Sequence, residues 1–320
     1  MTPGHVLVTG GAGFIGSHVV DVLMERPGVR VTVADKLTYA GSLENLALHD
    51  GADRFSFLRV DVADPEEMRR VVAGVDHVIH AAAESFVDRS IADADEFVRT
   101  NVVGTQSVLE ACRRSGIPLL NVSTDEVYGE GSEVPGEGLS EEEALAPRSP
   151  YAASKAAGDL LCRAYHVTYG LAVTVARGTN AYGPRQHPEK GFPTYAMSAL
   201  QNLPVPVYGD GRHRREWLFV TDFARAVLAI MDRGQPGGVY NIGGGFELEN
   251  RELAARICAL AGAPESLITS VPDRPGHDRR YGLRWDRLAG LGWRPQVSFD
   301  EGLARTIEWY RERLAAGVSP

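Results

Sequence analysis

The first half of the chain alternates short apolar runs with longer amphipathic segments. The apolar runs are rich in β-branched residues, which favour strands, and the segments between them repeat apolar residues at helical spacing. Strands are predicted at 5–10, 29–35, 55–61, 77–82, 119–124 and 172–177, and helices at 14–26, 65–73, 95–115 and 151–169. This alternation predicts parallel βαβ units, and therefore an α/β fold with a doubly wound parallel (Rossmann) sheet.

The alternation loosens in the second half of the chain. The run WLFVTDFARAVLAIMD (217–232) resembles a strand and a helix that return to the sheet, whereas the last part consists of short, Pro- and Arg-rich pieces before a final helix. We therefore expect a Rossmann domain over 1–178 that 216–243 rejoins, and a smaller, mixed α/β, substrate-binding domain formed by 179–215 and 244–320.

Composition and charge limit the partners of the protein. A formal net charge of −9 argues against a nucleic-acid partner, since phosphate backbones are bound by basic surfaces. No apolar run approaches the ~20 residues of a membrane span, and the opening residues lack the charged segment of a signal peptide. Cys112, Cys162 and Cys258 are too widely spaced for a disulfide framework or a metal cluster. We expect a cytoplasmic protein without a metal site, and a solvated loop over the charged stretch at 130–149.

Candidate functional residues gather where the predicted strands end. In a doubly wound sheet, ligands bind beyond the carboxyl ends of the strands. The motif GGAGFIG, Asp35, Asp61, the motif AAAES and the motif STDE all stand at or just after such an end. The sequence therefore predicts one site along this edge of the sheet.

The motif TGGAGFIG (9–16) is typical of a dinucleotide-binding turn, because it follows a strand and opens a helix. Gly10 permits the tight turn, Gly13 lets the backbone approach a pyrophosphate, and Gly16 lets the helix pack closely on the strand. The free N–H groups at the helix N-terminus would bind the anion.

Asp35 ends the second predicted strand, 19 residues after Gly16, where a carboxylate binds both ribose hydroxyls of adenosine. Its charge would repel a 2′-phosphate, and neither Lys36 nor Leu37 supplies an arginine, so NAD is favoured over NADP as the cofactor. Asp61 is placed to meet the adenine edge or, alternatively, to act as a capping acid. We also expect cofactor contacts from Phe14, Ile15, Lys36, Val62, Ala82 and Thr100.

Tyr151 and Lys155 in the motif YAASK stand four positions apart, on one face of a predicted helix. A lysine ammonium close to a phenol lowers the pKa of the phenol from ~10 toward neutrality. The pair therefore predicts a base that takes a proton from an alcohol while hydride leaves the same carbon. An ordinary surface-and-core pair is the alternative, but the preceding dinucleotide fold, with Ser123 and Thr124 upstream, favours the catalytic interpretation.

With these motifs in order along nearly the whole chain, the sequence resembles the extended short-chain dehydrogenase/reductase family. Within that family, the motifs of this chain are similar to those of the dTDP-glucose 4,6-dehydratases: DKLTYAG (35–41), STDEVYG (123–129), YAASK (151–155), HPEK (187–190) and DRPGHDRRY (273–281). The Asp–Glu pair of STDEVYG discriminates, because sugar-nucleotide epimerases lack it. Related decarboxylases and GDP-mannose dehydratases carry the glutamate without the aspartate.

The resemblance implies that the protein converts dTDP-glucose to dTDP-4-keto-6-deoxyglucose and water. Tyr151, beside Lys155, would remove the 4-hydroxyl proton as hydride passes from C4 to NAD, and Thr124 would hydrogen-bond the forming ketone. Glu126 would then take the C5 proton, and Asp125, protonated, would deliver one to the departing 6-hydroxyl before hydride returns to C6. Two acids that share a site tend to split their pKa values, so that one stays protonated near neutral pH.

An anionic nucleotide sugar needs basic contacts, although the chain is acidic overall. GRHRREW (211–217) and DRPGHDRRY are the dense arginine clusters of the second half. The implied substrate contacts are Arg215 and Arg274 at the diphosphate, Lys190 and Asn180 nearby, Tyr208 and His277 at the nucleoside, and in addition Ser85, Pro206 and Asn241. For any single arginine, a solvated surface role is the alternative.

Three positions depart from the family pattern. Phe86 stands where the family usually has histidine, Ala181 where it has asparagine, and Gly191 where it has leucine. These changes bear on cofactor retention and sugar tolerance, but they remove no catalytic group.

The resemblance also implies a homodimer, because in this family the helices at 95–115 and 151–169 pair across a two-fold axis. Their surplus apolar residues include Val102, Val103, Val108, Leu160, Leu161 and Tyr165. The alternatives to the dehydratase are another NAD-dependent nucleotide-sugar epimerase, decarboxylase or dehydratase and, more distantly, a non-catalytic Rossmann binding or sensing protein.

Overall fold

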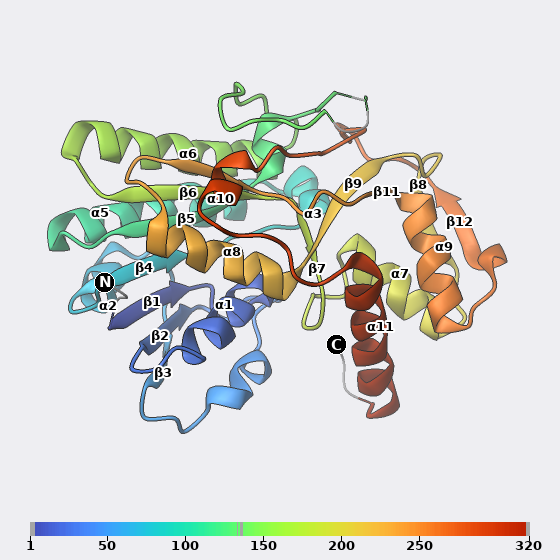
Figure 1. Cartoon of the computed structure of the whole chain (residues 1–320), viewed down its shortest axis with the longest axis horizontal. Helices are drawn as coiled ribbons and strands as arrows, with labels where there is room; N and C mark the ends of the chain where they lie inside the picture. The colour runs from blue at the N-terminus through green and yellow to red at the C-terminus, as the bar shows by residue number, and fades with distance from the viewer. Residues whose placement is uncertain (1–3, 133, 135–136, 318–320) are drawn as a thin grey trace.

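A seven-stranded parallel sheet forms the larger part of the protein, on the left of Figure 1. The computed structural model describes residues 4–132, 134 and 137–317. The strand order is β10-β6-β5-β4-β1-β2-β3, and every pair is parallel. The strands are β1 (His5–Thr9), β2 (Arg30–Asp35), β3 (Phe55–Arg59), β4 (His77–His80), β5 (Leu119–Thr124), β6 (Val173–Gly178) and β10 (Val239–Ile242). With β1 inside the sheet and later strands added on both sides, the predicted doubly wound α/β fold is confirmed.

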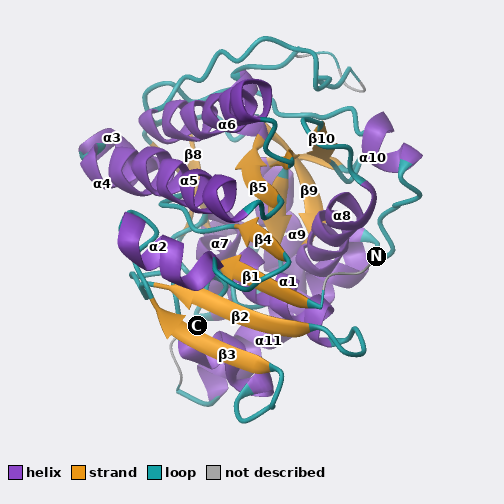
Figure 2. Cartoon of the chain, turned by 90° about the vertical axis from the view of Figure 1, so that its left-hand side faces the viewer, coloured by secondary structure: helices purple, strands orange, loops and turns teal. Residues whose placement is uncertain are grey.

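Helices cover both faces of this sheet because consecutive residues of a strand point to opposite sides. Val6 and Val8 of β1 pack into a core on one face, and Leu7 between them packs into a core on the other. The helices are α1 (Phe14–Met24), α8 (Val220–Arg233) and α10 (Asp286–Gly290) on the first face, and α2 (Pro65–Val72), α5 (Thr105–Ser115) and α6 (Pro150–Tyr169) on the second. Figure 2 shows α5 and α6 on one side of the strands and α1 and α8 on the other.

The predicted helix at 95–115 is interrupted near the site. Helix α4 (Asp95–Phe97) runs into a π-helical turn, η2 (Val98–Gly104), before α5 begins. Asn101 of this turn is buried, and its side chain accepts from the N–H and donates to the carbonyl of Glu84, both at 2.9 Å. It also donates to Ser154 Oγ of α6 at 2.9 Å. The turn therefore holds the AAAES segment, just before α3 (Val87–Ala92), against the helix that carries Tyr151.

The second part of the chain forms a smaller region of mixed structure, on the right of Figure 1. Strand β9 pairs with β11 antiparallel and with β7 parallel, and β12 pairs parallel with β8. The elements are β7 (Asn180–Tyr182), α7 (Gly191–Leu200), β8 (Val205–Tyr208), β9 (Arg214–Phe219), β11 (Glu247–Glu249), α9 (Asn250–Ala261), β12 (Ile268–Val271) and α11 (Phe299–Ala315). The apolar side chains of these elements pack into a separate core around Tyr182, Phe192 and Ile257. A short 3₁₀ helix, η4 (Glu265–Leu267), belongs to this region, whereas η1 (Leu43–His49) and η3 (Asp125–Tyr128) stand in the first half of the chain.

The strand predicted within 217–232 does not join the large sheet. It is the end of β9 and belongs to the small three-stranded sheet, because Trp217 and Phe219 pack into the core of the smaller region. The chain returns one element later: α8 packs against α1, and β10 pairs with β6 at the edge of the large sheet.

The described part of the charged stretch at 130–149 is a loop. Residues 133, 135 and 136 lie outside the described residues. The loop is less solvated than expected. Leu139 and Leu145 pack against a small cluster that contains Val127 and Tyr128, next to the acid pair. Of the helices in the described ranges, none has both the length and the apolar character needed to cross a bilayer.

Candidate active site

A cavity of about 280 Å³ opens at the carboxyl ends of β1, β2, β4 and β5, along the edge where the sequence predicts the site. The predicted cofactor and catalytic residues that line it are Gly10, Gly13, Phe14, Ile15, Gly16, Asp35, Lys36, Val62, Ala82, Thr100, Thr124, Asp125, Glu126, Tyr151 and Lys155. Of the predicted substrate contacts, Ser85, Asn180 and Lys190 line the same cavity. We call it the cofactor cavity.

The glycine turn between β1 and α1 fits a dinucleotide pyrophosphate. Gly10 has a φ of 69°, and a Cβ atom there would lie 2.5 Å from the backbone nitrogen of Ala82. A Cβ atom on Gly16 would overlap the carbonyl oxygen of Gly10. A Cβ atom on Gly13 would meet Gly10 O at 3.3 Å and no other atom within 4 Å, so this peptide faces open space in the cavity. An anion can therefore approach the backbone here and reach the free N–H groups of α1.

Asp35 ends β2 with its side chain at the cofactor cavity, where an adenosine ribose would lie. Its carboxylate accepts the N–H of Ala12 at 3.1 Å and that of Leu37 at 2.8 Å. Burial raises the pKa of Asp35, and these two hydrogen bonds oppose the rise. Lys36, the next residue, donates to Thr100 Oγ1 at 3.2 Å and so reaches across the cavity rim.

Tyr151 and Lys155 lie one turn apart on α6, and both are buried beside the end of β5. Ser149 caps the start of this helix by accepting the N–H of Ala152 at 3.1 Å. Lys155 Nζ donates to the carbonyl of Val122 at 2.8 Å. The hydrogen bond of Lys155 fixes α6 against β5, and the side chains of Tyr151 and Lys155 form part of the cavity wall.

The structure does not show the expected lowering of the Tyr151 pKa. Burial raises the pKa of Tyr151, and the charge of Glu126 adds to the rise, while the Thr124 hydroxyl opposes it. Burial is the main cause, and the ammonium of Lys155 donates to Val122 O of β5. Near neutral pH Tyr151 therefore rests as the phenol, and it must be ionised before it can act as a base.

Asp125 and Glu126 open η3 directly after β5, and their two side chains differ in surroundings. Burial raises the pKa of Asp125 to about 8, and the charge of Glu126 adds to the rise. Burial also raises the pKa of Glu126, but three cations, Arg274, Lys190 and Arg215, oppose it. Near neutral pH, Asp125 is therefore a proton donor, while the cations favour ionised Glu126.

A second cavity, of about 220 Å³, lies toward the smaller region, and we call it the nucleotide cavity. Glu126, Asn180 and Lys190 line both cavities, so Glu126 stands at their junction, next to Asp125 in the cofactor cavity. The other predicted substrate contacts that line it are Pro206, Tyr208, Arg215, Arg274 and His277. Burial lowers the pKa of Lys190 to about 8, and the charge of Glu126 opposes the change.

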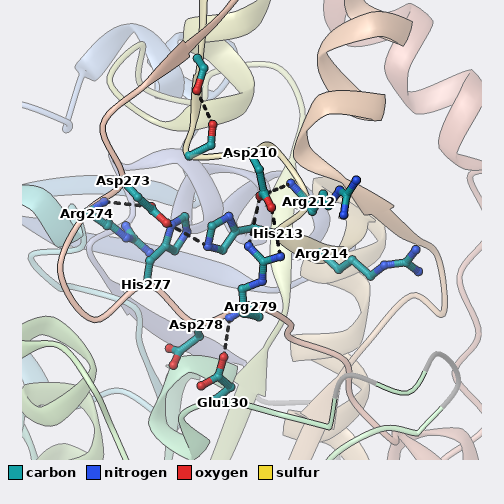
Figure 3. Close-up of polar contacts among 12 residues, drawn as sticks. Glu130, Asp210, Arg212, His213, Arg214, Asp273, Arg274, His277, Asp278 and Arg279 are labelled. Carbon is teal, nitrogen blue, oxygen red and sulfur yellow. Dashed lines mark hydrogen bonds and ion pairs between the residues drawn. The ribbon is translucent and has the colours of Figure 1, made fainter.

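The wall of the nucleotide cavity is held by polar contacts between two loops (Figure 3). Asp273 Oδ1 accepts from His277 Nδ1 at 2.6 Å, and Asp273 Oδ2 lies 3.3 Å from His213 Nε2. The two imidazole rings stack with their centroids 3.8 Å apart. The ring of Tyr208 meets His277 edge-on, with centroids 5.7 Å apart. Tyr208 and His277 thus form an aromatic corner of the cavity.

The ligand atoms of His213, Asp273 and His277 all lie within 4.8 Å of one another, a spacing that a metal ion could bridge. The stacked rings are only 13° from parallel, so their nitrogen lone pairs run side by side and do not meet at one point. The charges of Arg215 and Arg274 also act on His277, whose pKa is lowered chiefly by burial. We therefore interpret the cluster as support for the cavity wall.

Two predicted contacts lie outside the residues that line the two cavities. Asp61 stands at the rim and accepts from Arg99 Nη2 at 2.9 Å. Asn241 is buried, and its amide donates to the carbonyls of Leu139 and Arg284, both at 2.9 Å. Its side chain ties β10 to neighbouring loops.

The three departures from the family pattern lie in cavity walls. Ala181 lines the cofactor cavity, and Phe86 and Gly191 line the nucleotide cavity. Lys190 Nζ lies 5.6 Å from the centroid of the Phe86 ring, so this ring borders the junction of the cavities. A Cβ atom on Gly191 would meet no atom within 4 Å, which leaves open space there.

Sequence reasoning did not single out several residues that line the cavities. They are Glu84, His187 and Glu189 in the cofactor cavity, and Tyr195, Trp217, Asn250 and Tyr281 in the nucleotide cavity. The first three and Tyr281 stand inside the motifs AAAES, HPEK and DRPGHDRRY, which supplied a signal. Tyr195 and Trp217 belong to apolar patterns that indicate core packing, so the sequence carried no signal for them.

Comparisons with known proteins agree with this geometry. The model of the "NAD dependent epimerase/dehydratase family" matches residues 6–243. A dTDP-glucose 4,6-dehydratase of Actinoplanes sp. is 49% identical over 314 residues, which cover 96% of this chain and 97% of that protein. A crystal structure of DesIV, a dTDP-glucose 4,6-dehydratase of Streptomyces venezuelae, with NAD bound has a TM-score of 0.94 and 47% identity, and covers 98% of either chain. A UDP-glucose 4-epimerase of Thermus thermophilus in complex with NAD has a TM-score of 0.88 and 38% identity, and covers 96% of this chain and 99% of that one. Dehydratases and epimerases share this fold, so the site residues must separate them.

Proposed function

The chain belongs to the NAD dependent epimerase/dehydratase family, and from this premise we propose that it is a dTDP-glucose 4,6-dehydratase. It is a hydro-lyase that converts dTDP-glucose to dTDP-4-keto-6-deoxyglucose and water. The chemistry that NAD supplies when bound is acceptance of a hydride from C4 of the sugar and its return to C6. The residues that would hold the cofactor are the glycines of the turn, Asp35 and Lys155.

The observation that carries this proposal is the acid pair beside the catalytic helix, with Asp125 in the cofactor cavity and Glu126 at the junction of the two cavities. Epimerisation at C4 needs oxidation and reduction at one carbon, for which a tyrosine, a lysine and a hydroxyl suffice. Loss of water needs in addition a base for C5 and an acid for the 6-hydroxyl. Asp125 supplies the acid, because burial raises its pKa to about 8. Glu126 supplies the base, because three nearby cations favour its ionised form.

Oxidation at C4 falls to the residues of α6 and the end of β5. Tyr151 takes the proton of the 4-hydroxyl as the phenolate, although burial raises its pKa and so opposes ionisation. The Thr124 hydroxyl, beside it, donates to the oxygen that becomes the ketone. The ammonium of Lys155, one turn along, supplies positive charge that offsets the phenolate.

Elimination falls to the acid pair. The ketone at C4 makes the C5 proton acidic, and Glu126 removes it. Asp125, protonated below about pH 8, gives its proton to the 6-hydroxyl as that group leaves with its bonding electrons as water. Asp125 is buried and Glu126 is half-buried, so bulk water has restricted access to the pair.

The nucleotide cavity would hold the rest of the substrate. Arg215 and Arg274 offer guanidinium groups to the diphosphate, as planar forks suited to phosphate oxygens. Arg215 is itself held, since it donates to the carbonyl of Asp278 at 2.9 Å. Tyr208 and His277 present the aromatic corner to the nucleoside.

Further expectations about the whole protein stay proposals of the same kind. Residues 1–178 with 216–243 would bind the cofactor, and 179–215 with 244–320 would bind the nucleotide sugar. Apolar side chains on the outer surface of η2 and α6, among them Val103, Leu160 and Val167, are 45%, 57% and 72% exposed, which supports a homodimer through these helices. Val108, expected at that surface, is instead fully buried in the core beneath α5. Free, buried thiols fit a reducing cytoplasmic compartment.

Incubation of the purified protein with dTDP-glucose tests the proposed function. We expect a product lighter by one water that develops enone absorbance in alkali. A C4 epimer of unchanged mass would support an epimerase, and loss of the carboxyl carbon from a glucuronic acid substrate would support a decarboxylase. Tight NAD binding without conversion of any of these substrates would support a non-catalytic protein.

A further inference from the structure

A buried carboxylate beneath the catalytic pair has no part in the mechanism above. Asp159 lies one turn beyond Lys155 on α6, and its side chain is 2% exposed. Its Oδ2 pairs with Arg177 Nε of β6 at 2.8 Å, and its Oδ1 accepts from Asn121 Nδ2 of β5 at 3.2 Å. Burying an ion pair costs desolvation that its attraction does not reliably repay, so stability alone is a weak reason for its presence.

Lys155 and Asp159 face the same strand. Lys155 donates to the carbonyl of Val122. Asp159 accepts from the side chain of Asn121, the residue directly before Val122 on β5. Burial lowers the pKa of Lys155, and the charge of Asp159 opposes that change. In turn, burial raises the pKa of Asp159, and the charges of Arg177 and Lys155 oppose it. One buried carboxylate thus acts on two cations.

The other titratable groups that act on Lys155 are neutral near neutral pH. Burial lowers the pKa of His80, on β4, to about 3, so its ring stays uncharged. Burial raises the pKa of Cys162, on α6, well above its usual value. Tyr151, one turn before Lys155 on α6, rests as the phenol because burial raises its pKa, so it carries no charge until the reaction ionises it. Of the described groups that act on Lys155, Asp159 therefore supplies the negative charge.

We propose that Asp159 is a positioning residue of the reaction, whose carboxylate is the counter-charge that keeps Lys155 an ammonium in the buried catalytic helix. This inference rests on the proposed function, in which a charged Lys155 offsets the phenolate of Tyr151. Arg177 then serves to hold Asp159 ionised, and the ring of Tyr128 covers the guanidinium, whose central carbon lies 4.8 Å from the ring centroid. The ion pair supports the lysine as well as the fold.

The lysine content of the chain makes a direct test available. Lys36, Lys155 and Lys190 are the only lysines in the sequence, so protein labelled with carbon-13 lysine gives three sets of side-chain signals. Their chemical shifts report the pKa of each amine, and Lys36→Arg and Lys190→Arg assign Lys155 by elimination. In Asp159→Asn, we expect the pKa of Lys155 to fall by about 1–3 units relative to the wild type, the usual effect of losing a nearby opposite charge.

Two further variants separate this role from a structural one. Asp159→Asn leaves Arg177 as an uncompensated buried cation, which by itself destabilises the fold. The double variant Asp159→Asn/Arg177→Met removes both charges and should recover the stability lost in Asp159→Asn, but it still leaves Lys155 without the carboxylate. Asp159→Glu keeps the charge and should keep Lys155 near its wild-type titration. Asp222→Asn is the matched control, since it removes another buried carboxylate, in the first turn of α8 and remote from Lys155.

The inference holds if Lys155 titrates at least about one pH unit lower in the double variant than in the wild type and in Asp222→Asn. A wild-type titration of Lys155 in the double variant would show that Asp159 serves Arg177 alone, and would overturn it. Rapid mixing with dTDP-glucose gives a second reading, because the pH at which the NADH transient rises should move upward in the same variant. If the wild type forms no dehydrated product, the proposed function fails, while the lysine titration still decides the role of Asp159.

Discussion

The two cavities differ in how their side chains are held. In the cofactor cavity, the reacting groups stand on regular elements and are fixed by the backbone, as Lys155 is by the carbonyl of Val122. In the nucleotide cavity, Arg274 and His277 stand on the loop after β12, and side-chain pairs join this loop to the loop before β9. One such pair is Asp210 with Arg279, 3.1 Å apart and half-exposed (Figure 3).

This difference matches the two tasks. Chemistry depends on groups held at fixed positions with shifted pKa values, which buried, backbone-bound side chains provide. Binding of a diphosphate depends on charge and shape, which a loop cross-linked by ion pairs provides with less rigidity. Substitutions in the first cavity should therefore lower kcat, whereas substitutions in the second should raise KM.

Removal of the tyrosine hydroxyl should have the largest effect. In Tyr151→Phe, no base is left for the 4-hydroxyl, so we expect turnover to fall by about 10⁴-fold. The NADH transient on rapid mixing with dTDP-glucose should disappear as well. Tyr165→Phe is the matched control, because this tyrosine is on the same helix and its hydroxyl lies toward Glu110 at 3.5 Å. A normal NADH transient in Tyr151→Phe would remove it from the oxidation step.

Changes to the acid pair should slow the reaction after oxidation. In Glu126→Gln, we expect dehydration to slow by about 10³-fold, since C5 keeps its proton, while NADH still forms. In Asp125→Asn, dehydration should slow by about 10²-fold, while exchange of the C5 proton with deuterated water persists. Mass spectrometry of the recovered sugar distinguishes the two. Near-normal dehydration in Glu126→Gln, or loss of the NADH transient in Asp125→Asn, would contradict this division of labour.

A change in the nucleotide cavity should act on affinity. In Arg274→Gln, one charged contact with the diphosphate is lost, so we expect KM for dTDP-glucose to rise about 10- to 100-fold. The fall in kcat should be smaller, because Lys190 and Arg215 still favour ionised Glu126. Arg212→Gln removes an exposed arginine close by, outside the residues that line the cavities, and should change neither constant. A fall in kcat without a rise in KM would mean that Arg274 acts on the chemistry.

The smallest expected effect is that of pH on the wild type. Because burial raises the pKa of Asp125 to about 8, this acid carries its proton below that pH and loses it above. The rate of dehydration should therefore fall about tenfold for each pH unit above about 8. A stopped-flow pH profile checks this, and Asp125→Asn should lack the alkaline decline. Persistence of the decline in that variant would assign it to another group, such as Lys190.

Much of the cofactor cavity could be predicted from the sequence because its signals are local. The glycine turn, Asp35 and the YAASK spacing each combine a motif with the element that carries it, and the structure brings them to one edge of the sheet. The electrostatics could not be predicted in the same way. The direction of the Tyr151 pKa shift depends on burial and on the charge of Glu126, which only the packing around the end of β5 decides.

The nucleotide cavity and the path of the chain were harder to predict. Pattern alone suggested that the strand in 217–232 rejoins the large sheet, but Trp217 and Phe219 pack into the smaller core. Asn241 is predicted to contact the substrate, yet its amide donates to the backbone carbonyls of two loops. Such long-range pairings leave no periodic signal, and so they become visible only in three dimensions.

The central claim is that one site oxidises C4, eliminates water across C5 and C6, and reduces C6 with the same hydride. Turnover of dTDP-glucose carrying deuterium at C4 tests it most directly, with the position of the label read by mass spectrometry and NMR of the product. We predict that the deuterium appears at C6 of the 4-keto-6-deoxy sugar, within the molecule that supplied it. Recovery of the label at C4 of an epimer, or its loss to released NADH, would contradict the account.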